Sequence, residues 1–374
     1  MIYLDNAATS AKKPLCVFGK LFYESLFTSV NAGRGAHSKS LKAVKGINKT
    51  AEVLATLLNA EDPSCIAFTP NATYALNLAM LGLLKPGDHV IVTAMDHNSV
   101  LRPAAHFGEF TIVDADDNGF VNPKDIESAI RPETKLIVCT HVSNVCGSVQ
   151  PVEEIGKIAK KYEIHFLLDA SQSIGSMEVD TQKIGADLIA FSGHKGLLGP
   201  LGTGALYVEN DTDLKPVITG GTGSLSESLI QPHFMPDMLH TGTLNTPAIM
   251  ALGTAASCIE DPKTTHKYEK ELAELFIEDL LCMSGVSVYG PLKSNRNGTV
   301  SFNINGVDPA EVEDYLDKEK KIIVRSGYHC APIAHKVLGS DKKGSVRASF
   351  GYFNTNYDRI RLTDAIYNFL KGRK

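Results

Sequence analysis

One stretch of the chain decides its fold class. Residues 164–196 read IHFLLDASQSIGSMEVDTQKIGADLIAFSGHKG. They contain two short apolar runs, Phe166–Leu168 and Asp187–Phe191, with an amphipathic segment between them. Short apolar runs that alternate with amphipathic segments are typical of βαβ units and a mainly parallel sheet. The stretch therefore predicts an α/β protein.

The same alternation extends from about Ser64 to Val208. We expect helices at Pro123–Ile130, where Asn122 can cap the first free amides, and at Pro151–Tyr162. The apolar runs predict a seven-stranded sheet with strands at Cys65–Phe68, His89–Val92, Phe110–Val113, Lys135–Val138, Phe166–Leu168, Asp187–Phe191 and Gly204–Val208.

The pattern changes in the last third of the chain. Residues 220–244 are rich in Gly, Ser, Thr and Pro, which predicts a long functional loop, and a helix follows from Pro247. Beyond Asp261 the order becomes helix, strands (Val286–Tyr289 and Thr299–Phe302), helix, strand, helix, strand and a final helix from Tyr357. We therefore expect a large domain at 1–255 and a small α+β domain at 256–374, on which the N-terminal ~15 residues could pack.

Composition excludes several classes of protein. Charged residues make up 21% of the 374 residues, apolar residues 43%, and the formal net charge is −5. These values argue against disorder and against a polybasic face for nucleic acid. No apolar stretch is long enough to span a membrane, and the N-terminus lacks the features of a signal peptide. We expect a cytoplasmic enzyme that acts on small metabolites.

The seven cysteines are scattered and form no CxxC pair. This pattern argues against a disulfide framework or a zinc site and for reduced thiols, so no metal is expected.

Polar residues that directly follow the strands are the first candidates for a site, because ligands of open α/β sheets bind at the carboxyl ends of the strands. Asn71 and Thr73 follow the first run and open a helix, which suits either a phosphate site or a plain cap. Asp169 emerges from an apolar strand, where it could pair with a protonated pyridine nitrogen or cap the next helix. Lys195 lies between glycines after the next strand, where burial would lower its pKa and allow the neutral amine to form an imine.

At this point the sequence resembles the class V (fold type I) pyridoxal-phosphate enzymes, and within them the cysteine desulfurase and selenocysteine lyase branch of group II (SufS- and CsdA-like). The resemblance runs nearly end to end. It rests on residues 3–9 (YLDNAAT), 31–37 (NAGRGAH), 141–144 (HVSN), 169–172 (DASQ), 192–195 (SGHK) and 325–332 (RSGYHCAP).

The resemblance implies a role for each candidate residue. Lys195 would be the Schiff-base lysine, Asp169 would pair with the pyridinium nitrogen, and Gln172 would contact the phenolic oxygen. His97 would stack on the cofactor ring and carry protons. The phosphate would be held by Ala72, Thr73, Ser192 and His194, with Thr243 reaching across from the other subunit of a homodimer.

The same resemblance implies the substrate site. Arg347 would clamp the substrate carboxylate, Asn144 would assist it, and Ala7 and His37 would also contact the substrate. Cys330 follows His329 in the R-x-G-x-H-C-A pattern, and it would receive sulfur from L-cysteine as a persulfide while L-alanine is released. A sulfur-acceptor protein is then implied, in iron–sulfur assembly, tRNA thiolation or selenium metabolism.

Alternatives stay open from the sequence. The chain could be a selenocysteine lyase, a class V aminotransferase or lyase acting on another amino acid, or a non-catalytic member that relays sulfur. One departure concerns Tyr328, which stands where close relatives often have a second histidine. Cys146 also falls near the expected site, either as a packing residue or with a second redox role.

Overall fold

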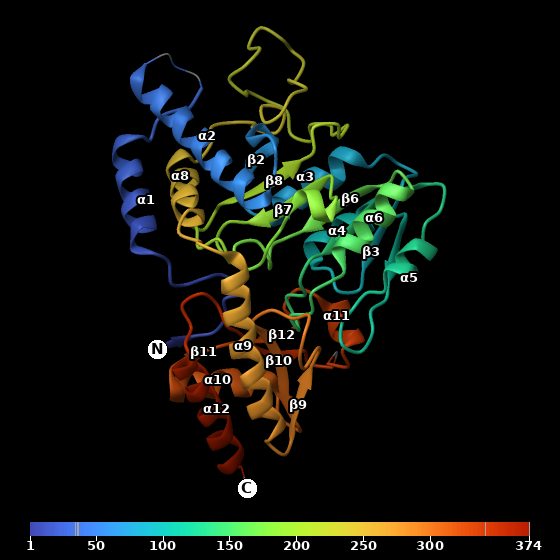
Figure 1. The fold of residues 1–374 in the computed structure, drawn as a ribbon, viewed down its shortest axis with the longest axis vertical. Helices are drawn as coiled ribbons and strands as arrows, with labels where there is room; N and C mark the ends of the chain where they lie inside the picture. Colours follow the sequence, from blue (N-terminus) through green and yellow to red (C-terminus); the bar gives the residue numbers. More distant parts are fainter. Residues whose placement is uncertain (34, 36, 341, 374) are drawn as a thin grey trace.

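A computed structural model describes residues 1–33, 35, 37–340 and 342–373 (Figure 1). Its central sheet has seven strands in the order β2-β8-β7-β6-β5-β3-β4. All neighbouring pairs from β7 to β4 are parallel, and β8 runs antiparallel to β2 and β7. The strands are β2 (Ile66–Thr69), β3 (His89–Thr93), β4 (Phe110–Val113), β5 (Thr134–Thr140), β6 (His165–Asp169), β7 (Leu188–Ser192) and β8 (Gly204–Val208). The predicted α/β class with a mainly parallel seven-stranded sheet is confirmed.

Both faces of this sheet are buried, which explains why its strands are apolar throughout. In β7, Ile189 and Phe191 belong to one core cluster, whereas Leu188 and Ala190 belong to another. The first cluster includes residues of α2 (Ser38–Leu58), α5 (Pro123–Ser128), α6 (Val152–Lys161), α7 (Thr181–Ile184) and α8 (Thr246–Ala256). The second includes residues of α3 (Ala72–Leu83) and α4 (Asn98–Phe107). The sheet is thus the middle of three layers.

The predicted element ends differ from the observed ends by a few residues. Cys65 lies in a short 3₁₀ helix, η1 (Pro63–Cys65), rather than in β2. Asn122 caps α5 as expected by accepting the Lys124 amide, but this helix already ends at Ser128. Pro151 is the residue before α6 rather than part of it.

A second sheet forms the core of the C-terminal part, with four antiparallel strands in the order β12-β13-β10-β9. Phe276 packs edge-on against Phe302 and Phe350 in its core. Where one strand was expected between α10 and α11, the chain forms two short strands, β11 and β12. The elements are α9 (Pro262–Leu281), β9 (Val286–Tyr289), β10 (Thr299–Ile304), α10 (Pro309–Lys320), β11 (Ile322–Ile323), β12 (Arg325–Gly327), α11 (Pro332–Val337), β13 (Ser345–Ser349) and α12 (Asn356–Lys371). The domain division at residues 255 and 256 stays a prediction.

The N-terminal segment crosses between the two parts of the chain. β1 (Ile2–Tyr3) pairs in parallel with β11, and Asp5 forms a bridge with Ser349. The chain then passes into α1 (Leu15–Phe27), which packs beside α8 at the edge of the large sheet (Figure 1). The first ten residues therefore lie where the two parts meet.

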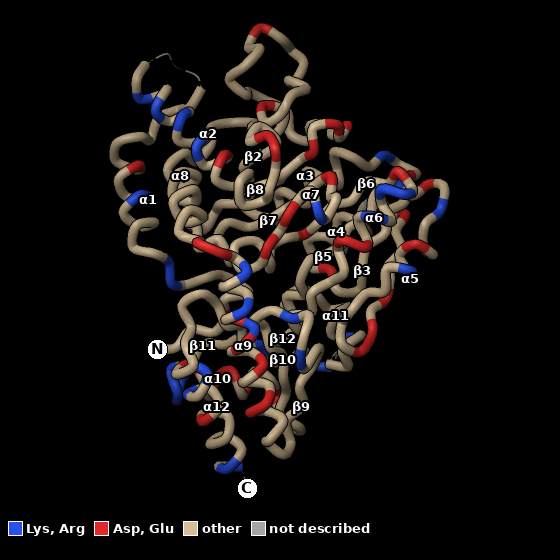
Figure 2. The backbone as a smooth tube through the Cα atoms, in the orientation of Figure 1, with Lys and Arg blue, Asp and Glu red and all other residues tan. Residues whose placement is uncertain are grey.

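Residues 209–245 contain no helix or strand in the described structure and extend from the large sheet as a long loop, as the sequence predicts (Figure 1). Basic and acidic residues are interspersed over both parts of the molecule (Figure 2). Among the described residues, no helix is both long and apolar enough to cross a membrane.

The contact between α6 and α7 depends on Gly156, where a side chain would collide with the backbone carbonyl of Ile184. We expect Gly156→Ala to lower the free energy of unfolding by about 1–3 kcal/mol, because backbone cannot yield as a flexible side chain can. The matched control is Gly19→Ala in α1, where nothing lies within 4 Å of the added carbon and a small gain in stability is expected. Urea denaturation of both variants tests this, and equal effects would contradict it.

Candidate active site

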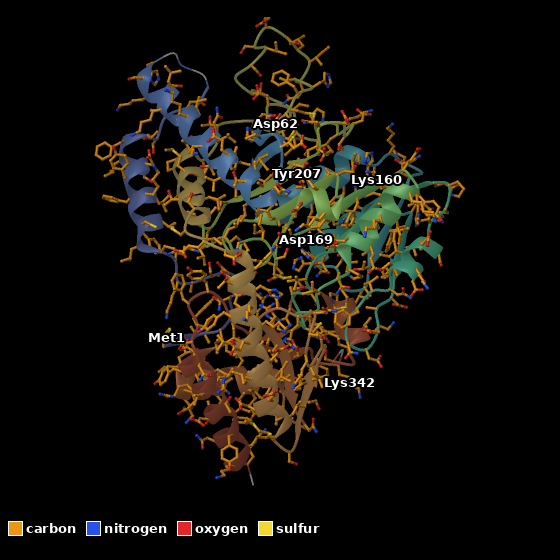
Figure 3. The ribbon with its side chains drawn as sticks, viewed as in Figure 1. Met1, Asp62, Lys160, Asp169, Tyr207 and Lys342 are labelled. Atoms are coloured by element: carbon orange, nitrogen blue, oxygen red, sulfur yellow. The ribbon has the colours of Figure 1, made fainter. Side chains whose placement is uncertain are left out.

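The carboxyl ends of β5, β6 and β7 meet at one edge of the large sheet. Thr140 pairs with Asp169, and Asp169 with Ala190, so the ends of the three strands are level. Figure 3 shows Asp169 at the edge that faces the C-terminal part, with Asp62 and Lys160 well away from it. Residues that follow these strands are therefore brought together where the two parts of the chain meet.

Lys195 lies in the loop after β7, deep among protein atoms, although part of its surface borders a small, partly open pocket. Desolvation lowers its pKa to about 8, and the positive charges of Arg347 and Arg325 act in the same direction while Asp169 opposes them. A lysine with this pKa has an appreciable fraction of neutral amine near neutral pH. The amine can therefore act as a nucleophile or a base.

Glycines fix the position of this lysine. A side chain at Gly175 would lie 2.6 Å from the backbone of Gly196, and one at Gly196 would lie 2.5 Å from the Ile174 carbonyl. The loops after β6 and β7 are thus in backbone contact. Lys195 is held in place relative to Asp169 by this contact.

The buried Asp169 uses one carboxylate oxygen locally. Its Oδ1 accepts hydrogen bonds from the Ser171 amide at 2.9 Å and the Ser171 hydroxyl at 2.5 Å. Its Oδ2 accepts none from the described residues. Asp169 therefore caps the turn after β6 and keeps one oxygen available for a cation, so the two alternatives that the sequence left open are compatible.

Gln172 connects the same turn to the N-terminal segment. Its Nε2 donates to the Ala7 carbonyl at 2.9 Å, and the Ala7 amide donates to the Ser349 hydroxyl at 2.9 Å. Ala7 thus lies between the loop after β6 and the second sheet.

The start of α3 lies against the end of β7. The Ala72 amide donates to the Ser192 hydroxyl at 3.1 Å, while the Asn71 side chain caps the helix by accepting the Tyr74 amide. Thr73 is exposed in the first turn of the same helix. An N-terminus of this kind, next to a hydroxyl, is suited to a phosphate group.

His194 follows Ser192 and contacts the N-terminal segment. Its Nδ1 lies 3.1 Å from the Thr9 hydroxyl, and its carbonyl accepts the Ser10 amide at 3.0 Å. Burial, together with the nearby positive charges of Lys195 and Lys13, lowers the pKa of His194 to about 4. The sequence analysis missed Thr9 and Ser10, although Thr9 stands within the quoted N-terminal motif.

Arg347 in β13 is fully buried. It donates to the Asn144 carbonyl at 2.9 Å and pairs with Asp5 at 2.6 Å, while its Nε has no partner in the described structure. Arg325 of β12 stands directly opposite it in the antiparallel pair. Two like charges placed opposite each other are unfavourable unless an anion joins them. Neither Asp5 nor Arg325 was assigned a role from the sequence; both stood within quoted motifs.

Cys330 is exposed on a tight turn. Both His329 and Cys330 have left-handed backbones, with φ of 48° and 58°. The turn is held by the Asn98 amide, which donates to the Cys330 carbonyl at 2.8 Å, and by the Asn144 side chain, which donates to the His329 carbonyl at 2.7 Å. The Asn144 side chain thus donates one hydrogen bond to the turn, and its assistance to Arg347 stays a prediction.

His97 joins this turn to the lysine. It precedes Asn98 and caps α4, with its Nδ1 accepting the Ser99 amide at 3.1 Å. Burial lowers its pKa, Lys195 lowers it further, and Asp169 raises it. His97 is thus within electrostatic range of both residues.

Two predicted residues are not brought to this site within one chain. Thr243 is exposed and borders a hollow with Thr69, Pro70 and Tyr74 near the start of α3. His37 is exposed and caps α2 by accepting the Ser40 amide at 3.2 Å. Arg34 and Ala36 of the quoted motif lie outside the described residues.

Cys146 and Tyr328 were also singled out in the sequence. Cys146 is fully buried, with its sulfur 3.4 Å from the Ser148 hydroxyl, which fits a packing residue. Tyr328 is half-exposed and lies edge-on to the ring of His335 at 5.6 Å. Among the described residues, no group of three or more His, Cys, Asp or Glu side chains is arranged to hold a metal.

The model of one known family matches almost the entire chain. The aminotransferase class-V model covers residues 2–361. The chain belongs to the aminotransferase class-V family. Enzymes of this family depend on pyridoxal phosphate.

Two similar curated relatives of this class-V chain carry the same printed name. A "Probable cysteine desulfurase" of Methanothermobacter thermautotrophicus is 38% identical, with 96% of this chain and 92% of the relative covered. One of Pyrococcus abyssi, with the same name, is 37% identical, with 95% and 90% covered.

Solved structures with the same fold include two cysteine desulfurases. The apo structure of cysteine desulfurase from Thermococcus onnurineus NA1 superposes with a TM-score of 0.92 at 34% identity, covering 99% of this chain and 95% of that one. The cysteine desulfurase CsdA of Escherichia coli gives a TM-score of 0.89 at 25% identity, with 99% and 94% covered.

Beside Lys195 the class-V chain has a small, partly open pocket of about 40 Å³, and Glu269 of α9 forms part of its wall. Burial raises the pKa of this glutamate to about 8. Folding therefore keeps Glu269 protonated at pH values where the unfolded chain ionises it. The contribution of Glu269 to the stability of the folded protein becomes less favourable as pH rises from about 4.5 to about 8. Above that range the contribution is constant.

We expect Glu269→Gln to raise the melting temperature at pH 8 by several degrees more than at pH 5, because glutamine has no proton to lose. Thermal unfolding at both values measures this. Glu271→Gln, at an exposed position of the same helix, is the control and should show no such difference. An equal gain at both pH values for Glu269→Gln would show that the carboxyl ionises normally in the folded protein.

Proposed function

We propose that this chain is a pyridoxal-phosphate-dependent cysteine desulfurase, which converts L-cysteine to L-alanine and transfers the sulfur to Cys330 as a persulfide. The observation that carries the proposal is one connected set of contacts. Cys330 is joined through Asn98 to His97, which is within electrostatic range of Lys195, and through His329 and Asn144 to Arg347. This network supports a site that combines an exposed thiol, an amine with a lowered pKa and a buried arginine.

The residues present fit the cofactor. Asp169 has an unused oxygen that would accept from the pyridine nitrogen, and Gln172 would contact the phenolic oxygen. The start of α3, with Ala72 and Thr73, would hold the phosphate together with Ser192 and His194. Lys195 would bind the cofactor carbonyl, and His97 would lie against its ring. When bound, pyridoxal phosphate supplies an electron sink for the charge that develops at the substrate Cα.

The protein groups perform the remaining tasks. Arg347, with an unpaired Nε and with Arg325 opposite, binds the substrate carboxylate. Lys195 removes the Cα proton as a neutral amine, which its lowered pKa allows. Cys330, as the thiolate, then attacks the substrate sulfur, so that an S–S bond forms while the Cβ–S bond breaks.

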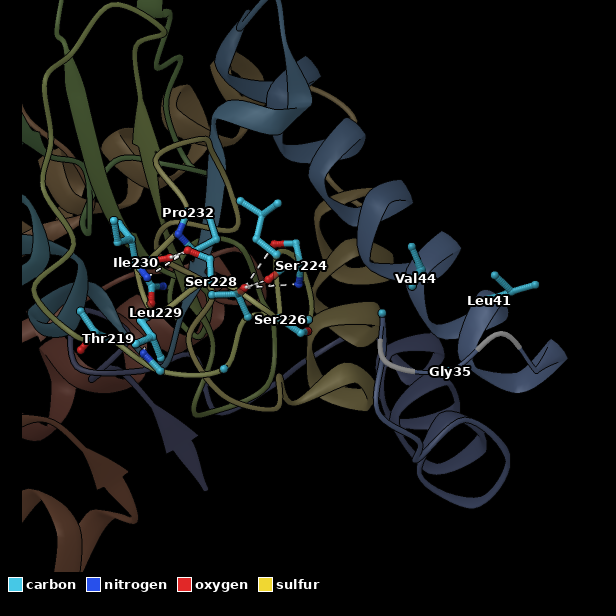
Figure 4. Close-up of a pocket in the computed structure, with 17 residues that line it drawn as sticks. Gly35, Leu41, Val44, Thr219, Ser224, Ser226, Ser228, Leu229, Ile230 and Pro232 are labelled. Carbon is cyan, nitrogen blue, oxygen red and sulfur yellow. Dashed lines mark hydrogen bonds between the residues drawn. The ribbon is translucent and has the colours of Figure 1, made fainter.

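The proposed function involves two protein partners, a sulfur acceptor and a second subunit. A sulfur-acceptor protein would collect sulfur from Cys330, whose exposure permits the transfer. A homodimer would bring Thr243 of the partner subunit to the phosphate. Support for the dimer comes from exposed Leu229 and Ile230, which line a hollow of about 1120 Å³ between residues 219–232 and the start of α2 (Figure 4).

Replacing the thiol gives the central test. We expect Cys330→Ser to lower alanine and sulfide release from L-cysteine, measured with a reductant present, by about 1000-fold or more, as when an enzyme loses its nucleophile. The absorbance of the bound cofactor should not change. Cys282→Ser, at another exposed cysteine, is the control and should keep full activity.

Each other outcome has a definite meaning. Normal alanine production by Cys330→Ser would refute the persulfide step. No activity in either the wild type or the variant, with cofactor bound, would favour a selenocysteine lyase or an aminotransferase, which turnover of L-selenocysteine or of amino-group acceptors would separate.

The role of Arg347 is tested by Arg347→Lys, which keeps the charge but loses the planar two-pronged donor. We expect KM for L-cysteine to rise about 10- to 100-fold, the loss of one charge-assisted pair, with cofactor absorbance retained. Steady-state kinetics measure the change. A KM equal to that of the wild type would place the carboxylate elsewhere.

A further inference from the structure

Two cysteines outside the candidate active site are in direct contact. Cys16 lies in the first turn of α1 and Cys258 directly after the C-cap of α8. Their sulfur atoms are 3.3 Å apart although 242 positions separate them in the sequence. Both are thiols in this structure.

The helices hold the two sulfurs in this position. α1 packs along α8, where Val17, Ala251, Ala255 and Leu198 form a buried cluster (Figure 1). The Cys258 sulfur is also 3.3 Å from the Thr254 carbonyl, one helical turn earlier. A bond between the sulfurs therefore needs little movement of either helix.

We propose that Cys16 and Cys258 form a reversible disulfide when the protein meets a low-molecular-weight disulfide. The site is a redox modification site, separate from Cys330 and independent of the proposed function. It does not contradict the absence of a disulfide framework, because both thiols are free under reducing conditions.

The two thiols have different roles in this exchange. Cys16 is exposed and meets the oxidant first. Burial, together with the neighbouring Cys16, raises the pKa of Cys258 to about 11, so Cys258 is a poor initial nucleophile. Once Cys16 is modified, the contact between the two sulfurs offsets this disadvantage.

The exchange is balanced in atoms and electrons. The Cys16 thiolate attacks one sulfur of the small disulfide, forms a mixed disulfide and releases one small thiol. Cys258 then attacks the Cys16 sulfur, so the protein S–S bond forms and the second small thiol leaves with the Cys258 proton. The protein loses two electrons, and the small disulfide gains them.

The bond would fasten the N-terminal segment to the large sheet. Cys16 follows Ser10, which binds the His194 carbonyl, and the α1–α8 contact covers Leu198 in the loop that carries Lys195. The bond involves no residue of the candidate site. Its expected effect is greater stability, because it closes a very long loop of the unfolded chain.

The test uses the holoenzyme carrying Cys330→Ser, so that the other reactive thiol is silent. It is incubated with increasing ratios of oxidised to reduced glutathione, alkylated and mapped by mass spectrometry. We expect a peptide pair linked through Cys16 and Cys258 and, in a sample weighed before alkylation, a protein two hydrogens lighter. With Cys258→Ser added, one glutathione should instead remain on Cys16; with Cys16→Ser added, no link should form. Cys282→Ser should leave the link intact.

The proposal fails if Cys16 carries glutathione without a linked peptide at every ratio, or if neither cysteine reacts. A second readout tests the fastening. The oxidised protein should melt several degrees higher than the reduced protein, with the difference lost on reduction and absent when Cys16→Ser is present. A linked protein with an unchanged melting temperature would refute the stabilising role.

Discussion

Desolvation of the Lys195 amine is the constraint on which the other features of the site depend. It lowers the pKa of the lysine to about 8, and the two arginines of the second sheet act in the same direction. The lysine is set deep because the loops after β6 and β7 touch through glycine backbones and the second sheet closes over them. Neither part of the chain alone would create this environment. The chemistry of the lysine therefore requires the two sheets to meet.

The N-terminal segment contacts both parts of the chain and stabilises their interface. Asp5 pairs with Arg347 of the second sheet, Ala7 joins Gln172 to Ser349, and Thr9 contacts His194 after β7. A segment of a few residues thus touches the substrate, ring and phosphate regions of the proposed site. Asp5 also neutralises part of the charge of Arg347, so under the proposed function a substrate carboxylate would compete with an anion that is already present.

The site residues that could be predicted are those whose positions follow from the order of strands along the sequence. Lys195 and Asp169 follow apolar strands, and parallel strands bring such residues to one edge whatever the details of packing. Asp5 and Arg347 are 342 positions apart, and no periodicity reports such a pair. β11 escaped prediction for the same reason, since its two residues become a strand only by pairing with residues 2–3. The raised pKa of Glu269 likewise comes from packing between distant segments. The role expected for Thr243 depends on a second subunit, which the sequence of one chain does not describe.

The turn that carries Cys330 would link substrate binding to sulfur transfer in the proposed function. Two successive left-handed residues without glycine are costly, and such strain persists only where the surroundings impose it. Here the imposing groups are the Asn98 amide and the Asn144 side chain. Asn144 also accepts the Arg347 guanidinium through its own carbonyl. The turn that holds the thiol and the position of Arg347 are therefore both tied to Asn144. Under the proposed function, Asn144 would set the distance between Cys330 and the sulfur of a substrate held by Arg347.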